Sequence, residues 1–286
     1  IGWINAEKNG RIEIGGTIYV SFGYINEDRI ERAAGLVGEI AGDIGSDRTF
    51  VAVLPTKGQA LVGSKYLVVD QMGTIRQFEG LGGVTAIDLS GLVDLASSGA
   101  YYRTDPHWSL DGVLWSYQQI ADSLGVEPST GYEHELFADS YLGSEYGRAA
   151  AGSIEADIIY LPRNAMIDGL TACRYSSLTD KLCVDSVFYR GAESEQDAYD
   201  VFLGGLGPII EITNPLAETD EELVIFKDSY AHAIAPLLAQ HYSKVTLFDL
   251  RYMRRSVVME NFDLSDSTVL FLYSSSVLNT DGQILN

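Results

Sequence analysis

A serine and a histidine in separate segments of the chain have neighbours suited to nucleophilic catalysis. Ser229 follows the strand-like run 222–226 and precedes an apolar segment, so we expect it where a strand ends and a helix begins. A serine at that place presents its Oγ at the edge of the sheet, and the following N–H groups with the helix dipole can stabilise an oxyanion. A plain helix N-cap is the structural alternative, because serine is also a preferred N-cap residue.

His107 has a carboxylate two residues before it, at Asp105. A histidine that deprotonates a serine needs a partner that fixes its tautomer and stabilises the imidazolium. Side chains two residues apart on an extended segment lie on the same face, and Pro106 between them favours an extended conformation at Asp105. The pair is therefore a candidate general base with its orienting carboxylate. The alternative is an Asx turn ahead of the proline, with His107 and Trp108 packed beneath it.

The elements around these residues alternate between strand and helix patterns. Apolar residues at helical spacing predict a helix over 109–124, with Ser109 as its N-cap and Gly125 as its stop. The segment that carries Asp105 and His107 is thus a loop leading into a helix. Other helices are predicted at 27–41 (with Asn26 as N-cap), 71–80, 193–202 and 229–240, and strands at 10–15, 17–22, 49–54, 84–88, 158–161, 184–189, 208–213, 222–226, 244–248 and 268–273.

The repeated β-α-β order predicts an α/β fold, a three-layer sandwich with a mostly parallel central sheet between helices. A single domain over 1–286 is expected, because no Pro/Gly/Ser-rich linker or block of charge divides the chain. The stretch 125–182 has a weaker pattern and is interpreted as a less regular excursion from the sheet. In this fold Asp105, His107 and Ser229 should meet at the carboxyl ends of strands.

Charge and hydropathy exclude several classes of function. The 286 residues include 40 Asp and Glu against 19 Lys and Arg, a formal net charge of −21 at pH 7. Such a surface repels phosphate backbones, so nucleic acids and anionic membranes are poor partners. The sequence contains no apolar run of the length that a membrane span needs. It begins at Ile1, so an export signal or anchor could have been removed.

The two cysteines, Cys173 and Cys183, belong to no zinc-binding pattern, and no metal or other cofactor is expected. In an exported protein they could form a disulfide across a hairpin, and in a reducing compartment they would be two small apolar residues. Both readings stay open from the sequence.

Taken together, the two segments resemble motifs of SGNH-hydrolase-like proteins, in the permuted order of the DHHW family and the related alginate O-acetyltransferase group. The segment 105–108, Asp-Pro-His-Trp, resembles the Asp-His-His-Trp signature of that family. The segments 226–231 and 247–252 resemble its C-terminal block, and 199–205 resembles its glycine-rich segment. The stretch 125–182 matches little.

This resemblance implies that Ser229 is the nucleophile, His107 the general base and Asp105 its orienting carboxylate. Candidates for the oxyanion or substrate site are Gly204, Gly205, Tyr102 and Lys227. The chain departs from the family pattern at three positions. Pro106 replaces a histidine that is not in the triad, Lys227 stands where glycine precedes Asp-Ser, and Leu206 replaces an asparagine that could donate to the oxyanion.

The expected activity is therefore acyl-ester hydrolysis or O-acetyl transfer on a cell-surface polysaccharide, by a protein located outside the cell or on its surface. The alternatives are a catalytically degenerate protein that binds a glycan or a partner, favoured by Lys227 and Leu206, and an intracellular esterase. The remaining histidines and glycine-rich segments are expected to be structural. They are His232, His134 within 133–135, His241, and the glycines of 80–83.

Overall fold

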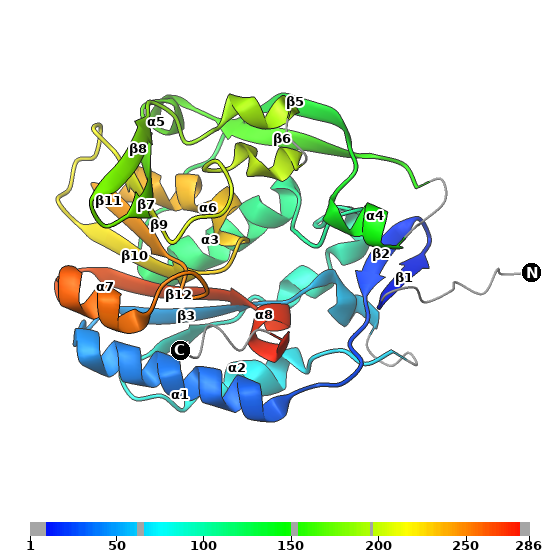
Figure 1. Ribbon diagram of the computed structural model, residues 1–286, viewed down its shortest axis with the longest axis horizontal. Helices are drawn as coiled ribbons and strands as arrows, with labels where there is room; N and C mark the ends of the chain where they lie inside the picture. Colours follow the sequence, from blue (N-terminus) through cyan, green and yellow to red (C-terminus); the bar gives the residue numbers. More distant parts are fainter. Residues whose placement is uncertain (1–9, 62–65, 150–153, 195–196, 281–286) are drawn as a thin grey trace, which may run out of the picture.

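A central sheet of eight strands organises the computed structural model, which describes residues 10–61, 66–149, 154–194 and 197–280 (Figure 1). The sheet is mixed: the first five strands in its spatial order run parallel, and each of the last three is antiparallel to the strand before it. That order is β4 (Thr85–Ile87), β3 (Thr49–Leu54), β12 (Thr268–Ser274), β10 (Glu222–Lys227), β11 (Lys244–Phe248), β9 (Ile209–Thr213), β7 (Thr171–Ser177) and β8 (Asp180–Val184).

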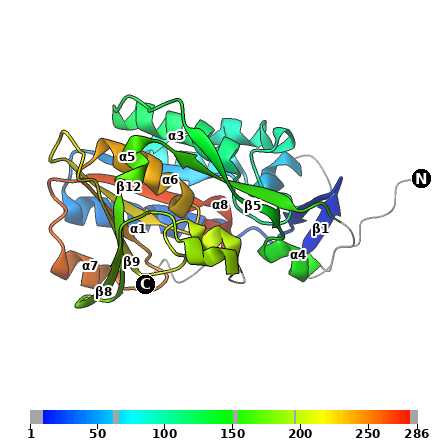
Figure 2. The same ribbon diagram turned by 90° about the horizontal axis from the view of Figure 1, so that it is seen from above.

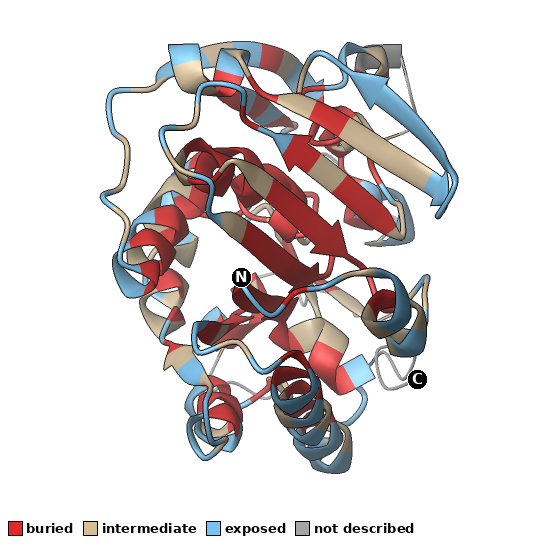
Figure 3. Cartoon of the chain, turned by 90° about the vertical axis from the view of Figure 1, so that its left-hand side faces the viewer, coloured by how far each residue is buried: buried red, intermediate tan, exposed pale blue. Residues whose placement is uncertain are grey.

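Helices cover both faces of this sheet. In Figure 1, α1 (Glu27–Ile44) and α2 (Gln71–Glu79) lie below it, and α3 (Leu110–Leu124) and α6 (Ala231–Leu238) lie above it. The strands supply apolar side chains to both layers, since alternate residues of β3 enter two different clusters: Val51 and Val53 pack with α1, and Ala52 and Leu54 with α3. Figure 3 shows the result, with buried strands between helices whose outer faces are exposed. The expected three-layer α/β arrangement is confirmed.

Short elements and two hairpins complete the structure. The hairpin of β1 (Arg11–Ile14) and β2 (Thr17–Val20) contacts α4 (Ser144–Ala149) beside one end of the sheet (Figures 1 and 2). The remaining helices are α5 (Ala165–Asp168), α7 (Arg255–Asn261), α8 (Ser275–Thr280), and the 3₁₀ turns η1 (Lys57–Leu61), η2 (Ser90–Val93), η3 (Ala96–Ser98), η4 (Arg190–Ser194), η5 (Ala198–Val201) and η6 (Ala239–His241). No helix within the described ranges is long and apolar enough to cross a bilayer.

Only part of the stretch 125–182 forms the expected excursion from the sheet. Strands β5 (Glu133–Tyr141) and β6 (Asp157–Arg163) form a separate antiparallel pair, whereas β7 joins the central sheet against β9. A disulfide joins the register partners Cys173 of β7 and Cys183 of β8. Of the two alternatives for the cysteines, the disulfide across a hairpin is therefore confirmed.

Two element predictions were wrong, and a third placed the start of a helix two residues too early. A strand was expected at 184–189, but β8 ends at Val184 and the chain turns into η4. One helix was expected at 193–202, but the described part of that range holds the end of η4 and the separate turn η5. The helix expected from Ser229 begins instead at Ala231, because Asp228 accepts a hydrogen bond from the N–H of Tyr230 and fixes a turn there.

Candidate active site

The loop before α3 and the turn after β10 meet at the carboxyl edge of the parallel strands. An isolated bridge between Tyr101 and Trp108 closes the base of the loop, so its middle residues project from the sheet. In the turn, Asp228 is fully buried, and its carboxylate accepts hydrogen bonds from the N–H groups of Ser274 and Tyr230. The turn is thereby tied to the end of β12, which fixes the position of Ser229.

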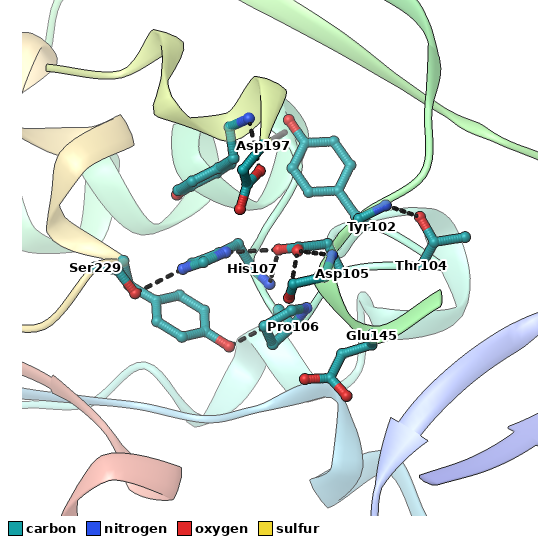
Figure 4. Close-up of polar contacts among 12 residues, drawn as sticks. Tyr102, Thr104, Asp105, Pro106, His107, Glu145, Asp197 and Ser229 are labelled. Atoms are coloured by element: carbon teal, nitrogen blue, oxygen red, sulfur yellow. Dashed lines mark hydrogen bonds and ion pairs between the residues drawn. The ribbon is translucent and has the colours of Figure 1, made fainter. Parts of the chain in front are cut away.

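Asp105, His107 and Ser229 form one continuous hydrogen-bonded chain (Figure 4). The distance from Asp105 Oδ1 to His107 Nδ1 is 2.6 Å, and that from His107 Nε2 to Ser229 Oγ is 2.7 Å. With Nδ1–H donated to the carboxylate, Nε2 is free to accept the proton of the serine hydroxyl. The arrangement has the connections that proton transfer from a serine requires.

The carboxylate of Asp105 is fully buried and saturated with donors. Its Oδ1 also accepts the N–H of His107 at 3.0 Å, and its Oδ2 accepts the N–H and the hydroxyl of Ser144 at 2.9 and 3.0 Å. Burial raises the pKa of Asp105, but the charge and hydrogen bonds of His107 and the N–H of Ser144 outweigh it and hold that pKa well below its usual range. Asp105 is therefore ionised throughout the neutral pH range.

Gly143 lies directly against this carboxylate. A Cβ added at Gly143 would stand 2.3 Å from Cβ of Asp105 and 2.7 Å from its Oδ2. We expect Gly143→Ala to displace Asp105 from His107 and to lower kcat on an ester at least about tenfold. Gly147→Ala is the matched control: Gly147 lies in α4, which begins just after Gly143, and no atom outside its own stretch of helix lies within 4 Å of its added Cβ. Equal kcat values for the two variants would contradict this role for Gly143.

The buried amine of Lys57 bonds the backbone of the loop that carries Asp105. Its Nζ donates to the carbonyls of Tyr102 at 2.7 Å, Arg103 at 3.2 Å and Asp105 at 2.7 Å. Lys57 itself lies in η1, immediately after strand β3. Three donors on one ammonium thus fix the backbone of the segment that carries the carboxylate.

Replacing Lys57 by methionine should lower the free energy of unfolding by about 2–4 kcal/mol, since buried carbonyls lose their donor. Burial lowers the pKa of Lys57 to about 8, against the opposing effect of the carboxylates Asp105, Asp157 and Glu145. From about pH 8 to pH 10 the unfolded state therefore binds more protons than the folded state. The stability difference between wild type and Lys57→Met should widen with pH, by up to about 1.4 kcal/mol per unit.

Urea unfolding of both proteins from pH 7 to pH 10 measures this widening. Lys244→Met, at a partly exposed lysine of β11, controls for the loss of a positive charge. A stability difference between wild type and Lys57→Met that stays constant over this range would contradict the lowered pKa of Lys57.

Aromatic rings enclose His107. Tyr199 stacks on the imidazole with ring centroids 4.0 Å apart, and Tyr230 lies tilted against it at 4.7 Å. The hydroxyl of Tyr230 donates to the carbonyl of Pro106 at 2.6 Å. The imidazole is therefore held in its plane by packing as well as by the carboxylate.

The four candidates for the oxyanion or substrate site have different surroundings. Tyr102 is buried against the rings of Tyr141 and Tyr199, and its side chain does not line the cavity beside Ser229. Gly204 and Gly205 both have positive φ, and added Cβ atoms would meet the side chains of Arg174 and Asp200. Glycine is therefore required at both positions.

Lys227 does not narrow the space around Ser229, because its side chain points into the protein interior. Its Nζ lies 2.7 Å from His232 Nε2 and 3.1 Å from Asp249 Oδ2, and all three side chains are buried. Burial, and then the charge of Lys227, lower the pKa of His232 well below its ordinary value, so this histidine is neutral and accepts from the ammonium. His232 belongs to this buried cluster, and among the described residues its side chain makes no hydrogen bond to the side chain of Ser229 or His107.

The other histidines also lie outside the chain of hydrogen bonds. His241 Nε2 bonds the hydroxyl of Tyr117 at 2.6 Å, and His134 lies on the exposed strand β5. Within the described residues, no group of three or more His, Cys, Asp or Glu side chains is arranged to hold a metal ion.

A cavity of about 570 Å³ opens beside Ser229 and His107. Its walls include residues 20–24, from the last residue of β2 onward, and residues of α8 such as Ser276 and Val277. This volume is in the range of small-molecule sites, and Ser229 is accessible from it. Sequence reasoning did not identify this cavity, Lys57, Ser144 or the stacking ring of Tyr199.

Comparisons with known proteins identify the fold. A DHHW family protein from Eubacterium siraeum superposes with a TM-score of 0.79 at 20% identity, over 100% of this chain and 97% of its own. Bacillus cereus PatB1 with a sulfonyl adduct superposes with a TM-score of 0.74 at 19% identity, over 96% of this chain and 97% of its own. The O-acetyltransferase domain of Pseudomonas putida AlgJ superposes with a TM-score of 0.48 at 12% identity, over 89% of this chain and 85% of its own. That TM-score is too low to support an inference. No family model and no curated protein matched the sequence.

The resemblance to the DHHW family that the motifs indicated is thus confirmed for the fold. At these identities the likeness is to the fold alone.

Proposed function

We propose that this chain is a serine esterase or O-acyltransferase in which Ser229 is the nucleophile, His107 the general base and Asp105 the orienting carboxylate. The observation that carries the proposal is the hydrogen-bonded chain from Asp105 through His107 to Ser229, which ends at the cavity. The order Asp105, His107, Ser229 is the permuted order of motifs expected for DHHW-like proteins.

In the first half of the reaction, His107 Nε2 takes the proton of Ser229 as Oγ attacks the ester carbonyl. The tetrahedral oxyanion collapses, the bond to the alcohol oxygen breaks, and His107 returns the proton to that alcohol. In the second half, His107 deprotonates water or a sugar hydroxyl as it attacks the acyl-serine. The bond between the acyl carbon and Ser229 Oγ then breaks, and His107 returns the proton to Oγ. Water gives hydrolysis, and a sugar hydroxyl gives acyl transfer.

The N–H of Ser229 is the first candidate donor to the oxyanion. Ser229 lies two residues after the end of β10, and its N–H has no acceptor among the described residues. Gly204 remains the candidate for a second donor, because its turn follows Tyr199, whose ring stacks on the imidazole, whereas the N–H of Gly205 donates to the carbonyl of Phe202. Leu206 is exposed and supplies no side-chain donor.

The proposed substrate is an acyl ester of a cell-surface polysaccharide, and the proposed location is outside the cytoplasm. The disulfide between Cys173 and Cys183 supports this location, because disulfides persist in oxidising compartments. The solved neighbour that carries a sulfonyl adduct suggests a direct probe for the nucleophile.

The experiment is labelling with phenylmethylsulfonyl fluoride, followed by mass spectrometry of the peptides. The wild type should gain one sulfonyl group on Ser229, and Ser229→Ala should gain none. Ser276→Ala is the control, because Ser276 lines the same cavity without contacting His107. An unlabelled wild type that still binds carbohydrate would favour the alternative of a catalytically degenerate glycan-binding protein.

A further inference from the structure

The ring of Tyr199 supports the imidazole of His107 in a way that the hydrogen bonds of the triad do not. The planes of the two rings differ by only 9°, with centroids 4.0 Å apart, and Tyr230 lies against the imidazole at 4.7 Å. In a close-packed site, a ring with such neighbours can turn about its Cβ–Cγ bond only if they move. While Tyr199 stays in place, Nε2 of His107 therefore stays directed at Ser229.

The side chain of Asp197 fixes the segment that carries this ring. Asp197 is the N-cap of η5, and its Oδ1 accepts the N–H of Tyr199 at 3.0 Å. The same oxygen accepts the hydroxyl of Tyr141, the last residue of β5, at 3.1 Å (Figure 4). One carboxylate oxygen thus joins the start of η5 to the end of β5.

Tyr141 is a permanent donor in a fixed position. Its side chain is buried, and its ring meets that of Tyr102 edge-on, with centroids 5.5 Å apart. Burial, and then the charges of Asp105 and Asp197, raise the pKa of Tyr141 far above its ordinary value. The hydroxyl therefore keeps its proton at every pH of an ester assay and always donates.

The residues that follow Tyr141 hold the other partner of the imidazole. Gly143 packs directly against Asp105, and Ser144 donates its N–H and its hydroxyl to Oδ2 of Asp105. The end of β5 and the start of α4 thus support His107 twice. They hold its carboxylate directly, and they hold its stacked ring through Asp197.

We propose that Asp197 and Tyr141 are positioning residues of the reaction: Asp197 holds Tyr199 over the imidazole of His107, and Tyr141 holds Asp197. The proposal rests on the function proposed above for Ser229. Neither residue touches the reacting atoms, so each acts through the orientation of His107.

The first test is hydrolysis of 4-nitrophenyl acetate by variants of Asp197. Asp197→Ala should lower kcat about tenfold or more, because it frees the ring that orients the base, and it should leave KM within about twofold. Asp197→Asn should keep kcat within about twofold of the wild type, since its amide oxygen accepts the same two hydrogen bonds and asparagine is also a good N-cap. Tyr141→Phe should lower kcat about threefold, because Asp197 keeps its bond to the N–H of Tyr199.

Matched controls exist for both kinds of change. Asp263 also accepts two hydrogen bonds on Oδ1, from the N–H and the hydroxyl of Ser265, but it lies before the start of β12, at the edge of the sheet opposite to Ser229. Tyr242 lies just before β11 and has a buried hydroxyl with no hydrogen bond among the described residues. Asp263→Ala and Tyr242→Phe should keep the wild-type kcat.

The second test observes the ring directly and needs no turnover. NMR of protein labelled at Cε1 of its four histidines gives one signal for each, and the loss of one in His107→Gln assigns His107. The ring current of Tyr199 shifts that signal, and Tyr199→Leu gives its position without the stack. Compared on the same plateau of their titrations, Asp197→Ala should move the signal most of the way to that position, and Asp197→Asn should leave it in place.

Three results would each overturn the proposal. They are equal kcat values for Asp197→Ala and Asp263→Ala, an unmoved His107 signal in Asp197→Ala, and an Asp197→Asn protein as slow as Asp197→Ala. A wild type that cleaves no ester would instead be a failure of the function proposed for Ser229. The His107 signal would then still decide whether Asp197 holds Tyr199 over the imidazole.

Discussion

Ser229→Ala is expected to reduce hydrolysis of 4-nitrophenyl acetate by a factor on the order of 10⁶ in kcat, to the limit that the assay can detect. The Oγ of Ser229 is the atom that His107 Nε2 contacts at 2.7 Å, and alanine leaves the base without a nucleophile to deprotonate. The N–H groups around the turn remain, so a small residual rate over that in water is expected.

The measurement is pre-steady-state release of 4-nitrophenol with substrate in excess, because a burst in the wild type reports the acyl-serine directly. Ser276→Ala should behave as the wild type, since Ser276 lines the same cavity without a contact to the imidazole. A Ser229→Ala protein with the wild-type rate would show that the hydrogen bond between Ser229 and His107 is only structural.

The parts of the fold that were predictable are those specified by nearby residues. The apolar spacing and caps of α3 predicted a helix over 109–124, and the structure has Leu110–Leu124 with Ser109 as N-cap and Gly125 in the left-handed C-cap conformation. The helix over 27–41 was also predicted, and its N-cap Asn26 accepts from the N–H of Arg29 as expected. The helix continues three residues beyond Ala41, to Ile44, with Gly45 as its C-cap.

Elements decided by distant contacts were not predictable. The start of α6 depends on Asp228. One of its carboxylate oxygens accepts the N–H of Tyr230, and the other accepts the N–H of Ser274, at the end of the neighbouring strand β12. The pairing of β7 with β9 depends on a strand that follows it by more than thirty residues. The spacing of apolar residues within one segment carries no information about a partner that is distant in the sequence.

The same division applies to the site. Asp105 and His107 are two residues apart, and their pairing followed from the geometry of an extended segment. Ser229 could be placed with them because the ends of parallel strands share an edge. Ser144 and Lys57, which fix Asp105 from 39 and 48 residues away, carry no local signal of that role. Lys227 was expected near the oxyanion, but alternation along β10 gave no way to foresee its buried partners, His232 and Asp249.

Asp105→Asn is expected to lower kcat/KM on the same ester by about 10²–10⁴-fold while the fold is retained. Neither orientation of the asparagine amide satisfies both neighbours. With its NH₂ toward Ser144, that group meets the backbone N–H that now donates to Oδ2. With its NH₂ toward His107, it donates to Nδ1 and stabilises the tautomer that carries its proton on Nε2, which cannot accept the proton of Ser229. Either way the charge that stabilises the imidazolium is gone.

Asp111→Asn is the matched control for this change. Asp111 lies in the exposed first turn of α3, so its replacement removes the same charge near the loop without removing the carboxylate that bonds His107. Circular dichroism and urea unfolding of both variants test whether the fold is kept. Because the pKa of Asp105 is held well below its usual range, the wild-type carboxylate stays ionised at every pH of a neutral ester assay, and the loss of rate in Asp105→Asn should not be recovered by raising the pH. Full activity of Asp105→Asn would mean that the Asp-Pro-His segment is a structured loop and that Ser229 acts without a triad.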